Sequence, residues 1–147
     1  MVELLRKIYE AIVQHAQEGW PNEICGLIAG NPDPIQVYRV KNSAENPMAM
    51  FIMDSQEQFK VMMEIEEKGW ELYGIYHSHP SSEAYPSQMD KDFARFYPDV
   101  LQFICSLEDR DNPRLRAFYI IDGDVREQGI RVVNTEPGEE KPIVCTP

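Results

Sequence analysis

Apolar residues recur along the chain with two periods, one typical of helices and the other of strands. From Val2 to Gln17 they fall every three or four positions, which predicts a helix with one buried side. Gly19 follows as a stop signal, and Pro21 lies just beyond it. The role expected of this helix is packing alone.

A second helix is predicted from Asp54 to Lys68, with Gly69 as its stop signal. Ser55 is placed to cap the first turn, and Gln58, three residues later, completes the pattern of a capping box. The apolar side of this helix consists of Phe59, Met62, Met63 and Ile65. A third helix is predicted from Pro86 to about Tyr97.

Short apolar runs bounded by turn residues predict strands. These runs are Ile24–Gly30, Ile35–Val40, Leu72–His79, Val100–Leu107, Leu115–Ile121 and Val125–Val133. Asp122-Gly123, between the last two runs, is a hairpin signal. Because helices and strands are interleaved, the predicted fold class is α/β, with a mixed sheet flanked by helices. Residues 1–133 are expected to form a single domain, and residues 134–147, rich in Pro and Glu, a loosely ordered tail.

The segment from Lys41 to Met53 fits neither period and allows two interpretations. It contains Pro47 and three methionines around Phe51. In the first interpretation it is a loop whose apolar residues pack into the core. In the second it is a flexible, methionine-lined surface that receives a partner protein.

Composition and charge exclude several classes of function. The 147 residues are enough for a packed core, and they carry a net charge of −11. Nucleic acids and anionic membranes attract Lys and Arg, so neither is an expected partner. No apolar run approaches the roughly 18 residues that span a bilayer. The three cysteines are scattered and the N-terminus lacks the pattern of a signal peptide, so a cytoplasmic location is expected.

The candidate chemistry is concentrated between Tyr76 and Asp90. His77 and His79 lie at the end of a predicted strand, where side chains alternate, so both rings should point to the same face. Ser87 and Asp90 follow at the start of the third predicted helix. Two imidazoles and a carboxylate match a catalytic zinc site, which uses three protein ligands and leaves a fourth position for water.

Hydrolysis at such a metal also needs a base that takes the proton of water and returns it to the leaving amine. Within the segment, Glu83 is the one carboxylate free for that task, and it is expected on a loop. Glu23 is the better candidate, because a glutamate that opens an apolar strand is unusual.

Each of these residues also has a simpler interpretation. A His-x-His pair is often incidental, and a charged residue at a strand end usually faces solvent. Ser87 followed by Asp90 is also a common helix start, with an N-cap and an acid in the first turn. The two roles of Ser87 are compatible, since a hydroxyl offers one donor and two acceptor sites.

Together these residues resemble the signature of the JAMM (MPN+) metalloproteases, a distant Glu followed by His-x-His-Pro-x6-Ser-x-x-Asp. The matching residues are Glu23, His77, His79, Pro80, Ser87 and Asp90. The resemblance implies one Zn²⁺ per chain, bound by His77, His79 and Asp90. It also implies Glu23 as general acid and base, and Ser87 as a hydrogen-bond donor to the tetrahedral intermediate. The implied fold is α/β and similar to that of the cytidine deaminases.

A closer resemblance is to the small bacterial Mec group, over roughly residues 4 to 133. It is carried by the segments Asn42–Pro47, Glu83–Ser87 and Ile121–Gly123. It implies release of cysteine from the C-terminus of a ubiquitin-like sulfur-carrier protein during cysteine synthesis. The Gly-Gly end of such a partner could add as a strand beside an exposed edge, expected near Met48–Met53 and Ser81–Tyr85. A homodimer is left open.

Three alternatives stay open beside this reaction. One is a non-catalytic MPN scaffold that binds partners, although such scaffolds generally lack part of the metal set. Another is a general deconjugating isopeptidase. The third is a thiol enzyme that uses Cys25, but this cysteine lies in an apolar pattern and is expected to be buried and inert.

Overall fold

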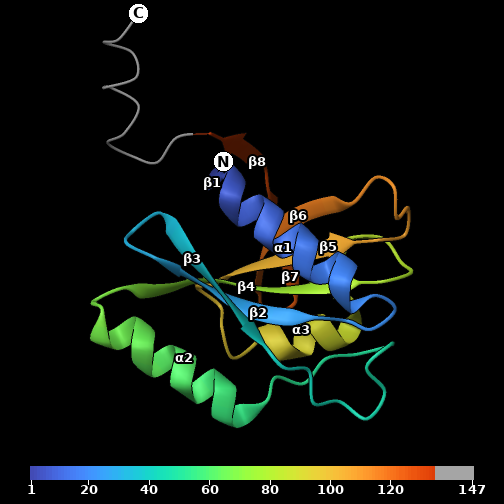
Figure 1. Cartoon of the computed structure of the whole chain (residues 1–147), viewed down its shortest axis with the longest axis horizontal. Coiled ribbons are helices and arrows are strands. Elements are labelled where there is room, and N and C mark those ends of the chain that lie inside the picture. Colours follow the sequence, from blue (N-terminus) through green and yellow to red (C-terminus); the bar gives the residue numbers. More distant parts are fainter. Residues whose placement is uncertain (135–147) are drawn as a thin grey trace, which may run out of the picture.

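A six-stranded mixed sheet forms the centre of the computed structural model, which describes residues 1–134 (Figure 1). The strand order is β3-β2-β4-β5-β6-β7, in which β4 and β5 are parallel and the other neighbouring pairs antiparallel. The strands are β2 (Cys25–Gly30), β3 (Pro34–Val40), β4 (Glu71–His79), β5 (Leu101–Ser106), β6 (Arg114–Ile121) and β7 (Asp124–Gln128). The predicted mixed sheet flanked by helices is confirmed.

Helices cover both faces of this sheet (Figure 1). They are α1 (Arg6–Gly19), α2 (Ser55–Glu67) and α3 (Gln88–Ala94). On one face, Ile8 and Ile12 of α1 belong to the same core as Tyr76 and Phe103 of the sheet. On the opposite face, the core around α3 consists of Ala84, Ala94, Ile104, Phe118 and Ile120. The site described below lies on this second face.

The helix predicted from Val2 is wrong in its first residues. Val2–Leu5 is a strand, β1, that pairs in parallel with β8 (Ile130–Val133). The backbone N–H of Val2 also donates to the carbonyl of Gly129 at 2.7 Å. The single strand predicted over Val125–Val133 is accordingly two strands, β7 and β8, which separate at Gly129. Pairing between the two ends of the described chain overrides the local helical period here.

The second helix also differs from its prediction. Asp54, and not Ser55, is the N-cap, and its carboxylate accepts the Glu57 N–H at 3.0 Å. Of the four residues predicted to face the core, Ile65 is buried, whereas Phe59 is 66% exposed. Met62 and Met63 are 36% and 44% exposed. Although α2 contacts β3 and β4, the part of the chain that the structure describes therefore leaves much of its apolar side uncovered. The apolar period therefore predicted the position of α2 in the sequence, but not how exposed its apolar side chains are.

Two further predictions concern the turn at Asp122-Gly123 and the C-terminal tail. The turn signal at Asp122-Gly123 is confirmed, because both residues adopt left-handed backbone angles, with φ of 52° and 79°. The tail predicted over residues 134–147 lies, from residue 135 on, outside the described residues. None of the described helices is long and apolar enough to cross a bilayer.

Candidate metal centre

The end of β4 carries both histidines on the face that α3 covers. Alternation along the strand places Tyr76 and Ser78 on the other face. There, the Ser78 hydroxyl accepts the backbone N–H of Ile24 at 2.9 Å, which ties the start of β2 to the end of β4. His77 and His79 are consequently presented side by side, and both are buried.

The first turn of α3 brings Asp90 to the same place. Ser87 is the N-cap, and its hydroxyl oxygen accepts the Asp90 N–H at 3.1 Å. In return, Oδ2 of Asp90 accepts the Ser87 N–H at 2.9 Å, which completes a capping box. This reciprocal pair fixes the direction of the Asp90 carboxylate. It leaves the hydroxyl proton of Ser87 able to donate elsewhere.

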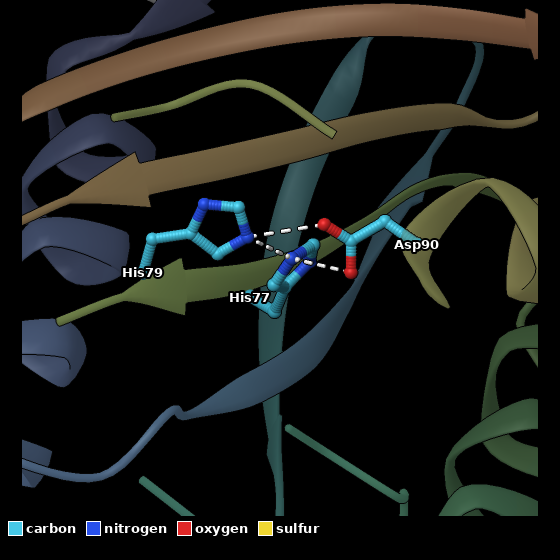
Figure 2. A group of neighbouring side chains, drawn as sticks. All are labelled: His77, His79 and Asp90. Carbon is cyan, nitrogen blue, oxygen red and sulfur yellow. Dashed lines mark hydrogen bonds and ion pairs between the residues drawn. The ribbon is translucent and has the colours of Figure 1, made fainter. Parts of the chain in front are cut away.

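Nitrogen and oxygen donors of His77, His79 and Asp90 converge on one point (Figure 2). The Nε2 atoms of the two rings are 3.1 Å apart. Oδ2 of Asp90 lies 3.0 Å from Nε2 of His79, and Oδ1 lies 3.2 Å from Nε2 of His77. Neighbouring donors of a tetrahedral zinc ion are about 3.3 Å apart, given Zn–N bonds of about 2.0–2.1 Å. The three side chains fit a small divalent cation.

The hydrogen bonding of His79 makes a bound cation favourable at this point. Its Nδ1 lies 2.8 Å from the carbonyl oxygen of Glu83, which can only accept, so Nδ1 carries the proton. In the neutral ring Nε2 then has a bare lone pair, which faces Oδ2 of Asp90 and Nε2 of His77. A proton on Nε2 would relieve this repulsion for one pair of atoms, whereas a metal ion relieves it for all three donors.

Opposing effects set the charge of these donors. Burial by itself would raise the pKa of Asp90, but the facing histidines and the Ser87 N–H lower this pKa overall. Burial would likewise lower the pKa of His79, but the bonds to Asp90 and to the Glu83 carbonyl raise it overall. Asp90 is therefore an anion, and it favours positive charge at the neighbouring ring.

Glu23 lies just before β2 and lines a cavity of about 80 Å³ together with Ser87 and Asp90. Burial raises the pKa of Glu23 to about 7; the Asp90 carboxylate adds to this rise and His79 opposes it. The other residues around the cavity are Ala49, Met50, Phe51, Met89 and Phe93. The structure thus brings the metal-ligand candidates together and places both catalytic candidates, Glu23 and Ser87, at one cavity with Asp90.

Phe51 is a site residue whose position the sequence pattern did not predict. Its ring stacks on that of His77, with centroids 4.5 Å apart and an angle of 28° between the planes. In the same loop Met53 is buried, as the first interpretation of residues 41–53 expects, whereas Met48 is 60% exposed. The surrounding methionines were the only signal. The carbonyl of Glu83, which holds His79, had no signal in the sequence pattern, because it belongs to the backbone.

The thiol of Cys25 takes no part in this arrangement. It is completely buried, and its Sγ donates a hydrogen bond to the carbonyl of Val40 at 3.3 Å. Burial raises the pKa of this thiol to about 12, so the nucleophilic thiolate does not form near neutral pH. The expectation that Cys25 is inert agrees with its surroundings.

Comparisons with known proteins agree on one family. The family described as prokaryotic homologs of the JAB domain matches residues 5–131. A CysO-cysteine peptidase from Mycobacterium tuberculosis is 35% identical over 128 residues, which cover 86% of this chain and 87% of that protein. A desampylase from Haloferax volcanii is 35% identical over 108 residues, covering 69% of this chain and 77% of that protein.

Solved structures are similar over nearly the whole chain. A solution structure of a protein from Desulfitobacterium hafniense has 33% identity and a TM-score of 0.83, covering 95% of this chain and 97% of that one. A JAB1/MPN domain protein from Archaeoglobus fulgidus has a TM-score of 0.61, covering 91% of this chain and 100% of that one. Because its identity is 18%, this second likeness shows the fold alone.

Proposed function

Since this chain belongs to the family of prokaryotic homologs of the JAB domain and is a hydrolase of the JAMM/MPN type, we propose that it uses zinc to cleave a bond at the C-terminus of a ubiquitin-like or sulfur-carrier protein. The bond we favour is the one that releases cysteine, because the mycobacterial relative is named a CysO-cysteine peptidase. The observation that carries the proposal is the convergence of His77, His79 and Asp90, together with a cavity that Asp90 and Glu23 both line.

The proposed ligands of the zinc ion are Nε2 of His77, Nε2 of His79 and the carboxylate of Asp90. When bound, zinc would lower the pKa of the attacking water and polarise the scissile carbonyl. Three protein ligands leave a fourth position open, as catalytic rather than structural zinc sites do.

Glu23 is proposed to move the proton. Its carboxylate takes the proton of the attacking water and returns it to the leaving amine. A carboxyl group with a pKa of about 7 holds and releases a proton with similar ease near neutral pH, which suits both steps.

Ser87 is proposed to stabilise the oxyanion. Its hydroxyl oxygen accepts the Asp90 N–H, so the hydroxyl proton is the group left to donate towards the carbonyl oxygen as negative charge develops. The capping box holds the serine at the cavity before substrate arrives, which avoids reorganisation during the reaction.

The dimensions of the cavity support a narrow substrate segment. About 80 Å³ between Met50, Phe51 and Met89 suits a stretch of chain without bulky side chains, such as a Gly-Gly terminus. Glu83 and Tyr85 belong to Ser81–Tyr85, one of the two segments expected beside the substrate tail, and have structural partners: the Glu83 carbonyl holds His79, and the Tyr85 ring packs edge-on against Phe118. We therefore favour the Met50–Phe51 side for the substrate tail.

A second candidate is a general deconjugating isopeptidase, which the name of the desampylase relative favours. The two reactions use the same site and differ in the leaving group, which is free cysteine in one and a lysine side chain in the other. A non-catalytic scaffold is the weaker option, because the full donor set is in place.

The decisive experiment presents one carrier protein ending in Gly-Gly in two forms, with cysteine added at its C-terminus or with its C-terminus linked to a lysine side chain. Mass spectrometry follows both. We expect zinc-loaded protein to remove the cysteine, a chelator to abolish the reaction and added zinc to restore it. Cleavage of the lysine-linked form alone would support the isopeptidase, and cleavage of neither would contradict both proposals.

Metal content tests the ligand assignment separately. We expect about one zinc per chain in the purified protein, and loss of that zinc in His77→Ala and Asp90→Ala. Asp92→Asn is the matched control, because this carboxylate lies on the same helix and bonds to Gln88 instead. Full zinc occupancy in either ligand variant would contradict the assignment.

A further inference from the structure

Asn42, at the start of the loop before α2, uses its side-chain amide in four hydrogen bonds. Its Nδ2 donates to the carbonyl of Glu23 at 2.9 Å and to that of Met50 at 3.0 Å. Its Oδ1 accepts the backbone N–H groups of Ala44 and Ile52, both at 3.0 Å. An amide has two donor hydrogens and two acceptor lone pairs, so these bonds use its whole capacity.

The backbone of Glu23 depends on this loop. Glu23 precedes β2, which begins at Cys25, so it lies outside the ladder of the sheet. Its carbonyl accepts from Asn42, and its N–H donates to the carbonyl of Pro47 at 2.7 Å. Both partners belong to residues 42–52, which therefore take the place of a neighbouring strand.

The same loop forms one wall of the cavity. Met50 and Phe51 line it, and Phe51 stacks on the ring of His77. Asn42 bonds to the carbonyl of Met50 and to the N–H of Ile52, the residues on either side of Phe51. One partly buried side chain thus holds both the backbone of the proposed base and the wall against which substrate would lie.

We propose that Asn42 is a positioning residue, which holds Glu23 at the metal centre and couples it to the loop that contacts the substrate tail. The inference rests on the proposed function, because it takes Glu23 as the proton-transfer group. Proton transfer needs hydrogen-bond reach to the attacking water, and a displacement of about 1 Å can cost about 100-fold in rate. No other side chain among residues 1–134 donates a hydrogen bond to the Glu23 carbonyl.

The test uses Asn42→Asp and Asn42→Ala. Aspartate keeps an acceptor for the N–H groups of Ala44 and Ile52, but it turns an oxygen instead of a donor towards the carbonyls of Glu23 and Met50. Alanine removes all four bonds without adding charge. With the cysteine-bearing carrier as substrate, we expect kcat to fall about 10- to 100-fold while zinc content stays at about one per chain. Ser43→Ala is the matched control, because it removes a bond to Ile52 in the same loop and does not contact Glu23. Its kcat should stay within about twofold.

A double-mutant cycle separates positioning from a general effect on folding. In a Glu23→Gln background, either Asn42 variant should lower kcat by less than about twofold, because the residue through which Asn42 acts has already been removed. An equal fall of kcat in both backgrounds would overturn the inference.

Amide hydrogen exchange gives a readout that needs no substrate. The Glu23 N–H should exchange faster in both Asn42 variants and at the wild-type rate in Ser43→Ala. Unchanged exchange at Glu23 would overturn the inference even if the carrier is cleaved. If the wild-type protein does not cleave the carrier, the proposed function fails, whereas the exchange measurement still decides whether Asn42 holds Glu23.

Discussion

The carboxyl group of Glu23 combines burial with closeness to another acid. It is 8% exposed, and the charge of Asp90 adds to the effect of burial on its pKa. Keeping a carboxyl group in such surroundings is unfavourable unless the protonated form is populated or a cation is near. The role proposed for Glu23 would account for this cost, because a base at a metal centre needs a pKa close to the working pH.

We predict that Glu23→Gln keeps about one zinc per chain but lowers kcat by about 10³-fold or more, because glutamine cannot carry the proton. Metal analysis and the carrier assay measure the two effects separately. Glu45→Gln, an exposed glutamate in the loop that lines the cavity, is the control and should retain its activity. Turnover close to normal in Glu23→Gln would identify a different base.

The start of α3 is the element in which structure and proposed chemistry coincide. A capping box normally stabilises a helix by satisfying its first backbone N–H groups. Here the acid of the box is also a candidate metal ligand, and the serine is also a candidate oxyanion donor. The helix itself covers only Gln88–Ala94, so its packing through Ala94 and its cap determine where Asp90 lies.

For this element we predict two separable losses in Ser87→Ala. The free energy of unfolding should fall by about 1 kcal/mol for the lost cap, and kcat should fall about 10²–10³-fold for the lost donor. Asp54→Ala, which removes the cap of α2, should cost similar stability and leave kcat within about twofold. Denaturant titration and the carrier assay distinguish these effects. A Ser87→Ala variant with reduced stability and unchanged kcat would make Ser87 a cap alone.

A partly buried polar contact joins α1 to the face of β4 opposite the metal centre. Nδ1 of His15 lies 2.7 Å from the hydroxyl of Tyr76, whose side chain is completely buried. Burial lowers the pKa of His15 to about 4, and the positive charge of Arg39 adds to this, although Glu18 opposes it. His15 is therefore neutral in the folded protein at neutral pH.

This contact predicts an acid sensitivity of the fold. In the unfolded chain His15 takes up a proton near pH 6.5, whereas in the folded protein it does so only near pH 4. Its contribution to stability is thus fully present above pH 6.5 and is lost as the pH falls towards 4. Between pH 7.5 and 4.5, the wild type should lose up to about 2 kcal/mol more stability than His15→Gln, allowing for partial exposure. Unfolding titrations of both proteins at matched zinc content measure this, and a constant difference would contradict it.

Local sequence rules predicted the arrangement of side chains correctly where the residues concerned are neighbours in the sequence. Alternation along a strand determines that His77 and His79 share a face, and the spacing of Ser87 and Asp90 determines a capping box. Both involve neighbours in sequence. Residue type and spacing were therefore enough to propose the donor set, whereas the roles proposed for Glu23 and Ser87 came from the resemblance to the JAMM signature.

Tertiary structure decided what depends on contacts between distant segments. Pairing with β8 makes Val2–Leu5 a strand, and the place of α2 at the sheet edge exposes Phe59. The approach of Glu23 to the metal centre and its attachment to Asn42 arise only when the loop before α2 packs against the start of β2. Periodicity reports which residues share a side of an element. It contains no information on what that side meets, because partners far apart in sequence are selected by the packing of the whole chain.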